Sequence, residues 1–155
     1  MRSSLSLIGW LGLSLAAGAI GAAASKPGAW YAALSKPPWT PPSWLFAPVW
    51  TLLYIAMGVA AWLVWRERGA APVGVAIGLF LAQLALNALW SWLFFAWHRL
   101  DLAAVEIVVL WVAIAATIVA FWRVRPAAGA LLLPYLAWVS FATALTVAIW
   151  RRNPA

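Results

Sequence analysis

The sequence contains no cysteine, a single histidine and only three acidic residues among its 155 positions. Without cysteine, a disulfide framework, a thiolate metal site and a cysteine nucleophile are all excluded. Charged residues make up 8% of the chain, against about a quarter in an ordinary soluble domain. Because so few charges cannot cover a water-facing surface, the composition excludes a soluble globular domain.

The basic residues are too scattered to form a nucleic-acid surface. The formal net charge is +7, but the ten lysines and arginines occur in ones and twos between apolar runs. Nucleic-acid-binding domains instead gather their basic side chains on one face or along one helix. We therefore expect no nucleic-acid partner.

Apolar residues make up 67% of the chain. Five windows reach the roughly 20 residues that cross about 30 Å of hydrocarbon, and Glu106 is the only formal charge inside them. These windows are residues 5–24, 45–64, 73–96, 102–122 and 127–150. We predict an all-α integral membrane protein: a bundle of five transmembrane helices that forms one multi-pass domain over residues 1–155.

The connections and flanking charges bear on topology. Short connections at 66–72, 98–101 and 123–126 predict that successive helices run antiparallel as neighbours. The first window resembles a cleavable signal peptide, but its apolar run is longer than the 7 to 15 residues of that segment, so we favour a retained helix. Lysine and arginine are tied at five on each side, so they do not fix the orientation. The two sets are Arg2, Arg66, Arg68, Arg123, Arg125 and Lys26, Lys36, Arg99, Arg151, Arg152.

The connection at residues 25–44 is the only long one, and it combines five prolines with four tryptophan or tyrosine residues. Proline fixes φ and lowers the entropy cost of ordering. We predict a stiff, ordered, non-helical lid loop over one mouth of the bundle. A plain interfacial anchor is the alternative.

The third predicted helix has two distinct faces at about 100° per residue. Gln83, Asn87 and Trp90 fall on one side, where they either line a cavity or join helices through hydrogen bonds. A stripe of small residues falls on the other side and predicts helix packing, within the chain or across a homodimer. The stripe comprises Gly74, Gly78 and Ala82.

Fourteen tryptophans exceed what two interfacial belts need. Trp50 and Tyr54 share a face of the second helix, and Trp138, Ala142 and Leu145 share a face of the fifth. Each stripe alone is typical of packing. Together with Trp90 and an aromatic lid, they predict a cavity for a flat apolar ligand that stacks on rings.

The remaining chemistry-bearing residues are isolated. We interpret Glu106 as a satisfied carboxylate near the interface, although titration inside the bundle is the alternative. His98 has no second ligand at metal-binding spacing, which disfavours a haem axial role. We find no catalytic triad, acid–base pair, P-loop or metal motif, so we expect no catalytic and no metal site.

Several rare residues stand together at spacings that carry a family resemblance. They are Trp30-Tyr31, Lys36-Pro37-Pro38-Trp39-Thr40-Pro41-Pro42, Pro48-Val49-Trp50 with Tyr54, Gln83-Leu84-Ala85-Leu86-Asn87, Phe94-Phe95, and Pro134-Tyr135-Leu136-Ala137-Trp138 with Phe141-Ala142-Thr143. Over nearly its whole length the chain resembles the translocator protein family, also called the TspO or tryptophan-rich sensory proteins and the peripheral benzodiazepine receptors.

The resemblance implies a five-helix bundle, often a homodimer, with a pocket closed by the first loop. In the family this pocket binds porphyrins such as protoporphyrin IX, other haem-type tetrapyrroles, and isoquinoline carboxamide or benzodiazepine drugs; no cofactor is required. With the lid aromatic Trp39 added, the expected ligand-binding residues are Tyr31, Trp39, Pro41, Trp50, Tyr54, Asn87, Trp90, Trp138, Ala142 and Leu145. An acidic residue at the position of Glu106 is also a family feature.

One departure from the animal members concerns sterols. Their cholesterol-recognition pattern of Leu, Tyr and Arg has Val147 at the tyrosine position here, between Leu145 and Arg151. We therefore do not predict cholesterol binding through this segment. The leading functional hypothesis is a membrane receptor or sensor that affects tetrapyrrole handling or stress signalling. The alternatives are a transporter of porphyrin or lipid, and an enzyme that degrades bound porphyrin by light or oxidation; the sequence favours binding over catalysis.

Overall fold

The computed structural model describes residues 2–24 and 28–153, and these form helices without a strand. The helices are α1 (Arg2–Ala24), α2 (Ala29–Ala33), η1 (Ser43–Leu45), α3 (Phe46–Trp65), α4 (Gly74–Ser91), η2 (Trp92–Ala96), α5 (Leu100–Val124), α6 (Pro126–Leu131) and α7 (Leu133–Arg152). Within the described residues, five helical stretches are long and apolar enough to cross a membrane. The predicted all-α, five-span bundle is confirmed.

Two of these spans are interrupted. The third span ends in a π-helical turn, η2, in which the Trp97 N–H donates to the Trp92 carbonyl at 2.8 Å. The fifth span is divided at Leu132, directly before the proline-containing first turn of α7. Proline lacks the N–H that would continue the α6 hydrogen-bond ladder, so a break at this position is expected.

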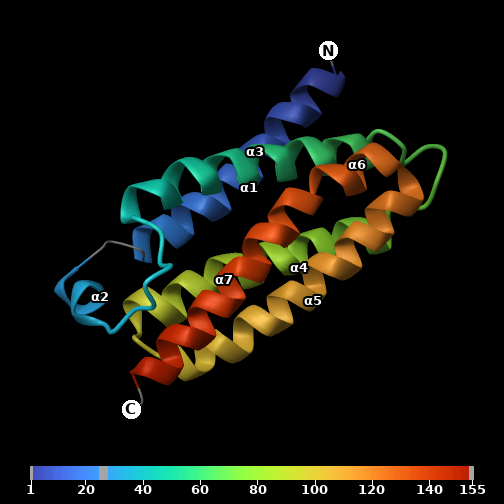
Figure 1. The fold of residues 1–155 in the computed structure, drawn as a ribbon. Helices are drawn as coiled ribbons and strands as arrows, with labels where there is room; N and C mark the ends of the chain where they lie inside the picture. Colours follow the sequence, from blue (N-terminus) through green and yellow to red (C-terminus); the bar gives the residue numbers. More distant parts are fainter. Residues whose placement is uncertain (1, 25–27, 154–155) are drawn as a thin grey trace.

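The five spans lie side by side as a bundle (Figure 1). α1 packs against α3 and α4, α5 packs against α4 and α7, and α6 contacts α3. The sequence neighbours α3 and α4 share much less contact than either shares with α1. Their connection at residues 66–73 can reach past the end of α1 at about 3.3 Å per residue. The prediction that helices joined by short connections pack as neighbours therefore holds poorly for α3 and α4, because each of them packs mainly against α1 rather than against the other.

The lid loop differs from the prediction of a non-helical segment. Residues 29–33 form α2, and residues 43–45 form η1. The stretch from Gly28 to Ser35 contains no proline, so nothing removes the N–H donors that a helical turn needs. Residues 25–27, including Lys26 and Pro27, lie outside the described part of the chain.

The stripe of Gly74, Gly78 and Ala82 faces outward from the bundle. A Cβ atom built on Gly74 or Gly78 would meet no atom within 4 Å. Packing of this stripe within the chain, one of the two predicted alternatives, is therefore wrong. The stripe is available to a second molecule.

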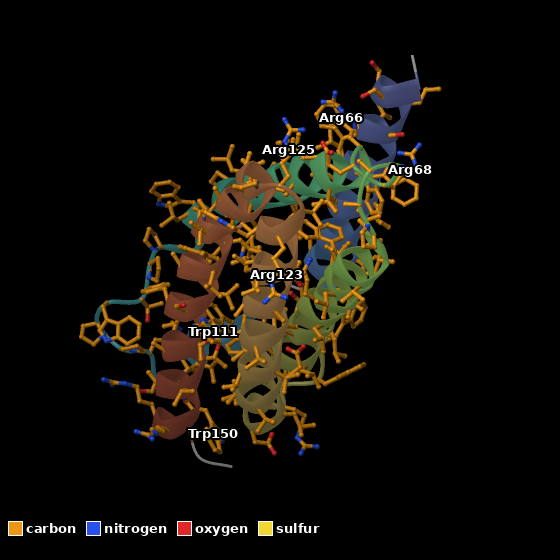
Figure 2. The ribbon with its side chains drawn as sticks, turned by 90° about the vertical axis from the view of Figure 1, so that its right-hand side faces the viewer. Arg66, Arg68, Trp111, Arg123, Arg125 and Trp150 are labelled. Atoms are coloured by element: carbon orange, nitrogen blue, oxygen red, sulfur yellow. The ribbon has the colours of Figure 1, made fainter. Side chains whose placement is uncertain are left out.

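The basic residues occupy both ends of the bundle. Arg66, Arg68 and Arg125 lie at the end near the start of α1, whereas Trp150 lies at the opposite end (Figure 2). Arg99, Arg151 and Arg152 flank the ends of α5 and α7 on the lid side. The side chain of Arg2 and the whole of Lys26 lie outside the described residues.

Helices α1 and α3 approach closely at Gly58. A Cβ atom on Gly58 would lie 2.9 Å from the Leu11 Cα atom and 2.8 Å from its Cδ2 atom. Because a backbone atom cannot swing away, a side chain at this position forces the two helices apart.

We predict that Gly58→Ala lowers the apparent Tm of the detergent-purified protein, at a cost of about 1–3 kcal/mol from overpacking. Gly9→Ala is the matched control, because a Cβ on Gly9 would meet nothing within 4 Å and alanine is the better helix former. Equal stability of the two variants would show that the α1–α3 contact is looser than described.

Candidate ligand cavity

A cavity of about 590 Å³ lies between the helices beneath the lid loop. Its wall is built by α1, α2, α3, α4, α5 and α7, together with η1 and η2. Most of the ten predicted ligand-binding residues line it. Those in the wall are Tyr31, Trp50, Tyr54, Asn87, Trp90, Trp138, Ala142 and Leu145.

Trp39 and Pro41 do not line this cavity. Residues 37–40 form a turn in which the Thr40 N–H donates to the Pro37 carbonyl at 3.1 Å, and this turn carries Trp39 outward, where its side chain is 47% exposed. The Trp39 ring meets Phe141, a lining residue, edge-on at 5.7 Å. Trp39 thus contacts the wall from outside, and a role of Trp39 and Pro41 in ligand binding stays a prediction.

Aromatic rings form two groups on the cavity wall. Trp50 stacks on Tyr54 at 5.7 Å and meets Trp138 edge-on at 6.4 Å. In the second group, Trp90 stacks on Phe94 at 5.2 Å, and Phe94 contacts Phe95. Ring faces of this kind suit a flat apolar ligand.

Small residues on α1 leave the space that the rings enclose. Gly18, Ala19 and Ala22 line the cavity opposite the aromatic residues. A Cβ on Gly18 would lie 2.7 Å from the Tyr54 ring, and one on Gly21 would lie 3.2 Å from the Ser91 hydroxyl. Larger side chains on this face of α1 would therefore fill the cavity or displace its wall.

A chain of buried hydrogen bonds joins three helices at the cavity wall. The Tyr54 hydroxyl donates to the Asn87 carbonyl oxygen, and the Asn87 amide donates to the Tyr135 hydroxyl at 2.8 Å. The Tyr135 hydroxyl in turn donates to Gln83 Oε1 at 2.8 Å. The sequence left two roles open for these amides, lining a cavity or joining helices. Gln83 joins helices, whereas Asn87 joins helices and also lines the cavity.

Two indole N–H groups of wall residues have no acceptor among the described residues. The Nε1 atoms of Trp90 and Trp138 are buried and have no hydrogen-bond partner in the described part of the chain. Because these atoms have almost no accessible surface, the two tryptophans present ring carbon atoms to the cavity. The described lining residues include no charged side chain.

The lid is fastened to the bundle at both of its flanks. The Asn153 side chain accepts from the Ser35 N–H at 3.0 Å and donates to the Ser35 carbonyl at 2.8 Å. The Trp30 ring stacks on His98 at 4.0 Å, with an angle of 10° between the planes. These contacts tie α2 to the end of α7 and to the connection before α5.

Lys36 organises the part of the lid that faces the cavity. Its Nζ atom donates to the Tyr31 carbonyl at 2.7 Å and to the Leu34 carbonyl at 3.2 Å, and it lies 4.6 Å from the Tyr31 ring centre. Burial raises the pKa of the Tyr31 phenol above its usual value, so this hydroxyl stays neutral at physiological pH. Lys36 is thus the cation held beside the mouth of the cavity.

Glu106 differs from the prediction of a satisfied interfacial carboxylate. It is 8% exposed, and neither carboxylate oxygen has a hydrogen-bond partner among the described residues. Its neighbour Asp101, by contrast, pairs with Arg99 at 2.9 Å at the start of α5. One turn of helix separates the two acids and carries Glu106 into the bundle interior. In the described chain, no group of three or more potential metal-ligating side chains occurs.

This combination of features defines a class of protein: a multi-pass membrane protein with a cavity lined by aromatic residues between its helices and under an ordered loop. The model of the TspO/MBR family matches residues 10–151. The chain belongs to this family, as the resemblance in its sequence predicted. Membership supports a role as a membrane sensor or receptor.

Relatives from distant organisms cover most of the chain. The human translocator protein is 46% identical over 126 residues, which span 80% of this chain and 75% of that protein. The tryptophan-rich protein TspO of Chlorobaculum tepidum is 45% identical over 159 residues, covering 99% of both chains. The tryptophan-rich sensory protein of Cereibacter sphaeroides is 41% identical over 128 residues, covering 83% of this chain and 79% of that protein.

Sequence reasoning missed three contributions to the cavity. The small residues of α1 carry no polar or aromatic signal, and Phe94 and Phe95 lie in a π-helical turn that breaks the 100° periodicity. Tyr135 was part of the family resemblance, but no pattern in the sequence around it predicts that its hydroxyl joins the hydrogen-bond chain. That role depends on how α4 packs against α3 and α7 in the folded protein.

We predict that Tyr135→Phe destabilises the protein by about 1–3 kcal/mol, because it leaves the buried Gln83 and Asn87 amides with one partner fewer each. Thermal unfolding in detergent measures the effect. Tyr31→Phe is the control, since the Tyr31 hydroxyl makes no hydrogen bond within the described residues. If both variants unfold at the wild-type temperature, the hydrogen-bond chain does not hold the helices together.

Proposed function

We propose that this protein is a membrane receptor or sensor that binds porphyrins, such as protoporphyrin IX, in the cavity beneath the lid. Isoquinoline carboxamide and benzodiazepine drugs would bind in the same place. Ligand binding would affect tetrapyrrole handling or a stress response. The observation that carries the proposal is the enclosed cavity itself, in which tryptophans from α3, α4 and α7 face one space.

The size and lining of the cavity support a ligand of this class. Its volume of about 590 Å³ falls within the range of roughly 300–1,000 Å³ typical of small-molecule sites. A flat ring would stack on Trp50, Trp90 and Trp138. The Asn87 side chain in the wall would fix the orientation of the ring.

The charge pattern supports one orientation for a porphyrin. Propionate groups are anionic, and the described lining of the cavity offers no cation inside. Lys36 beside Tyr31 is a cation at the mouth. The macrocycle would therefore enter with its apolar edge first and leave its propionates near Lys36 and the water.

Transport finds less support than binding. Interrupted helices form the substrate sites of many transporters, and the fifth span is interrupted at Leu132. However, no residue between 126 and 137 lines the cavity. The break at Leu132 therefore lies outside the cavity wall. The π-helical turn η2 does contribute Phe94 and Phe95 to the wall, but its backbone stays helical and hydrogen-bonded, unlike the unwound segments of transporter sites.

We predict that the detergent-purified protein binds protoporphyrin IX saturably, and that Trp138→Phe weakens binding by about three- to tenfold because the smaller ring offers less stacking area. Asn87→Ala should weaken it further, because the change also releases Tyr54 and Tyr135. Titration followed by porphyrin absorbance keeps the readout independent of the tryptophan content.

Trp150→Phe is the control for this experiment, because Trp150 lies outside the cavity lining and is 39% exposed. Circular dichroism checks that each variant is folded. Unsaturable binding, or wild-type affinity in both folded cavity variants, would remove the tetrapyrrole assignment and leave the tryptophans as packing residues.

We also propose that two copies of the chain associate through the outward stripe of Gly74, Gly78 and Ala82. Small residues let helix backbones approach closely, which is how many membrane helices pair. We expect Gly78→Leu to shift the protein from dimer to monomer in single-molecule photobleaching in lipid bilayers. Gly12→Leu places the same side chain on another outward face and should leave the oligomeric state unchanged; an equal effect of both would contradict the α4 interface.

A further inference from the structure

A second, shallow cavity lies at the end of the bundle away from the lid. It has a volume of about 220 Å³ and is lined by Ser3, Ser6, Trp65, Arg66 and Arg68. The first two residues belong to the beginning of α1, and the others lie at and just beyond the end of α3. It shares no lining residue with the ligand cavity. We call it the headgroup pocket.

The two arginines of the headgroup pocket are held in place without an acidic partner. Arg66 lies over the Trp62 ring at 4.8 Å, and Arg68 lies over the Trp65 ring at 4.6 Å. Arg68 also donates one N–H to the Trp65 carbonyl at 2.9 Å. The intervening acid, Glu67, pairs instead with Arg125 at 3.6 Å. Among the described residues no carboxylate neutralises Arg66 or Arg68, so most of their donors are free.

The position of the headgroup pocket along the bundle corresponds to the membrane–water boundary. The second span ends at Trp65, so Arg66 and Arg68 follow directly after the last membrane-crossing residue. Trp10 and Trp65 contact each other at 5.8 Å beside the pocket, and Trp62 donates its N–H to the Ser3 carbonyl at 2.8 Å. Tryptophans of this kind mark the depth of the lipid headgroups.

The exposed apolar residues at the start of α1 are not part of the headgroup pocket. Leu5 and Ile8 are largely exposed, but at about 100° per residue they lie on the side of α1 that faces away from Ser3 and Ser6. The match to a lipid therefore rests on depth: the unpaired arginines follow directly after the last membrane-crossing residue of the second span, where the phosphates of lipids lie.

We propose that the headgroup pocket binds the phosphate of an anionic phospholipid. The guanidinium groups of Arg66 and Arg68 and the hydroxyls of Ser3 and Ser6 would donate to the phosphate oxygens. The acyl chains would extend from the pocket into the bilayer. Because the described lining includes no carboxylate to hold a choline or ethanolamine cation, the site favours phosphatidylglycerol over a zwitterionic lipid.

The test is native mass spectrometry of the full chain titrated with phosphatidylglycerol or with phosphatidylcholine of the same acyl chains. Wild type should bind phosphatidylglycerol more tightly, and the double variant Arg66→Gln/Arg68→Gln should lose about fivefold in affinity for each arginine removed. The variant Arg66→Lys/Arg68→Lys keeps the positive charge and should lose much less affinity for phosphatidylglycerol. Arg151→Gln/Arg152→Gln makes the same change in charge at the other end and should bind like wild type.

Two further measurements keep the proposal falsifiable. Wild type alone should gain more thermal stability from phosphatidylglycerol than from phosphatidylcholine, and added salt should reduce the difference; no difference would overturn the proposal even if the glutamine variant failed to fold. Equal losses of affinity in the two glutamine variants, at Arg66/Arg68 and at Arg151/Arg152, would show general attraction of the lipid to positive charge. That result would also overturn the proposal. Displacement of the lipid by equimolar glycerol 3-phosphate would assign the site to a soluble phosphate ester and exclude the lipid.

Discussion

The structure depends on one chain of buried hydrogen bonds, from Tyr54 through Asn87 and Tyr135 to Gln83. Inside a bilayer no water competes for these groups, so each must find its partner on another helix. The chain therefore fixes the rotation of α3, α4 and α7 about their own axes. Trp50 stacks on Tyr54, and Trp90 lies one turn after Asn87, so the same bonds orient the cavity wall. The same side chains therefore hold the helices in register and form part of the cavity wall.

Space for a ligand exists because the bundle of helices is asymmetric in side-chain size. Helix α1 presents glycine and alanine to the cavity, and the other helices present rings. Packing of rings against rings alone would close the gap, as it does between Phe80 and Phe121, whose centres lie 5.8 Å apart. The lid completes the enclosure through contacts at its flanks, with Asn153 on one side and His98 on the other. Further ring contacts, of Tyr31 with Phe95 and of Trp39 with Phe141, join the lid to the bundle between these flanks.

Features with a short-range physical cause could be predicted from the sequence. Hydrocarbon thickness sets the length of the five spans, and helical periodicity places Asn87 and Trp90 on one face. The positions of Trp39 and of residues 29–33 could not be predicted, because the path of the lid depends on the contact of Ser35 with Asn153, 118 residues away. The contribution of Phe94 and Phe95 was hidden for a different reason: a π-helical turn shifts the face on which each residue appears. The family resemblance supplied the pocket residues that periodicity alone left ambiguous.

The two cavities show how depth in the membrane decides which polar groups a site uses. Within the bundle a charged side chain is expensive, and the described lining of the ligand cavity is accordingly uncharged, with Lys36 outside it in the lid. At the far end, where water and headgroups solvate charge, two arginines remain unpaired beside tryptophan rings. Glu106 is the exception, since it is buried without a partner among the described residues. A protonated Glu106 side chain would be neutral like the cavity lining, which makes it compatible with an interior that otherwise excludes charge.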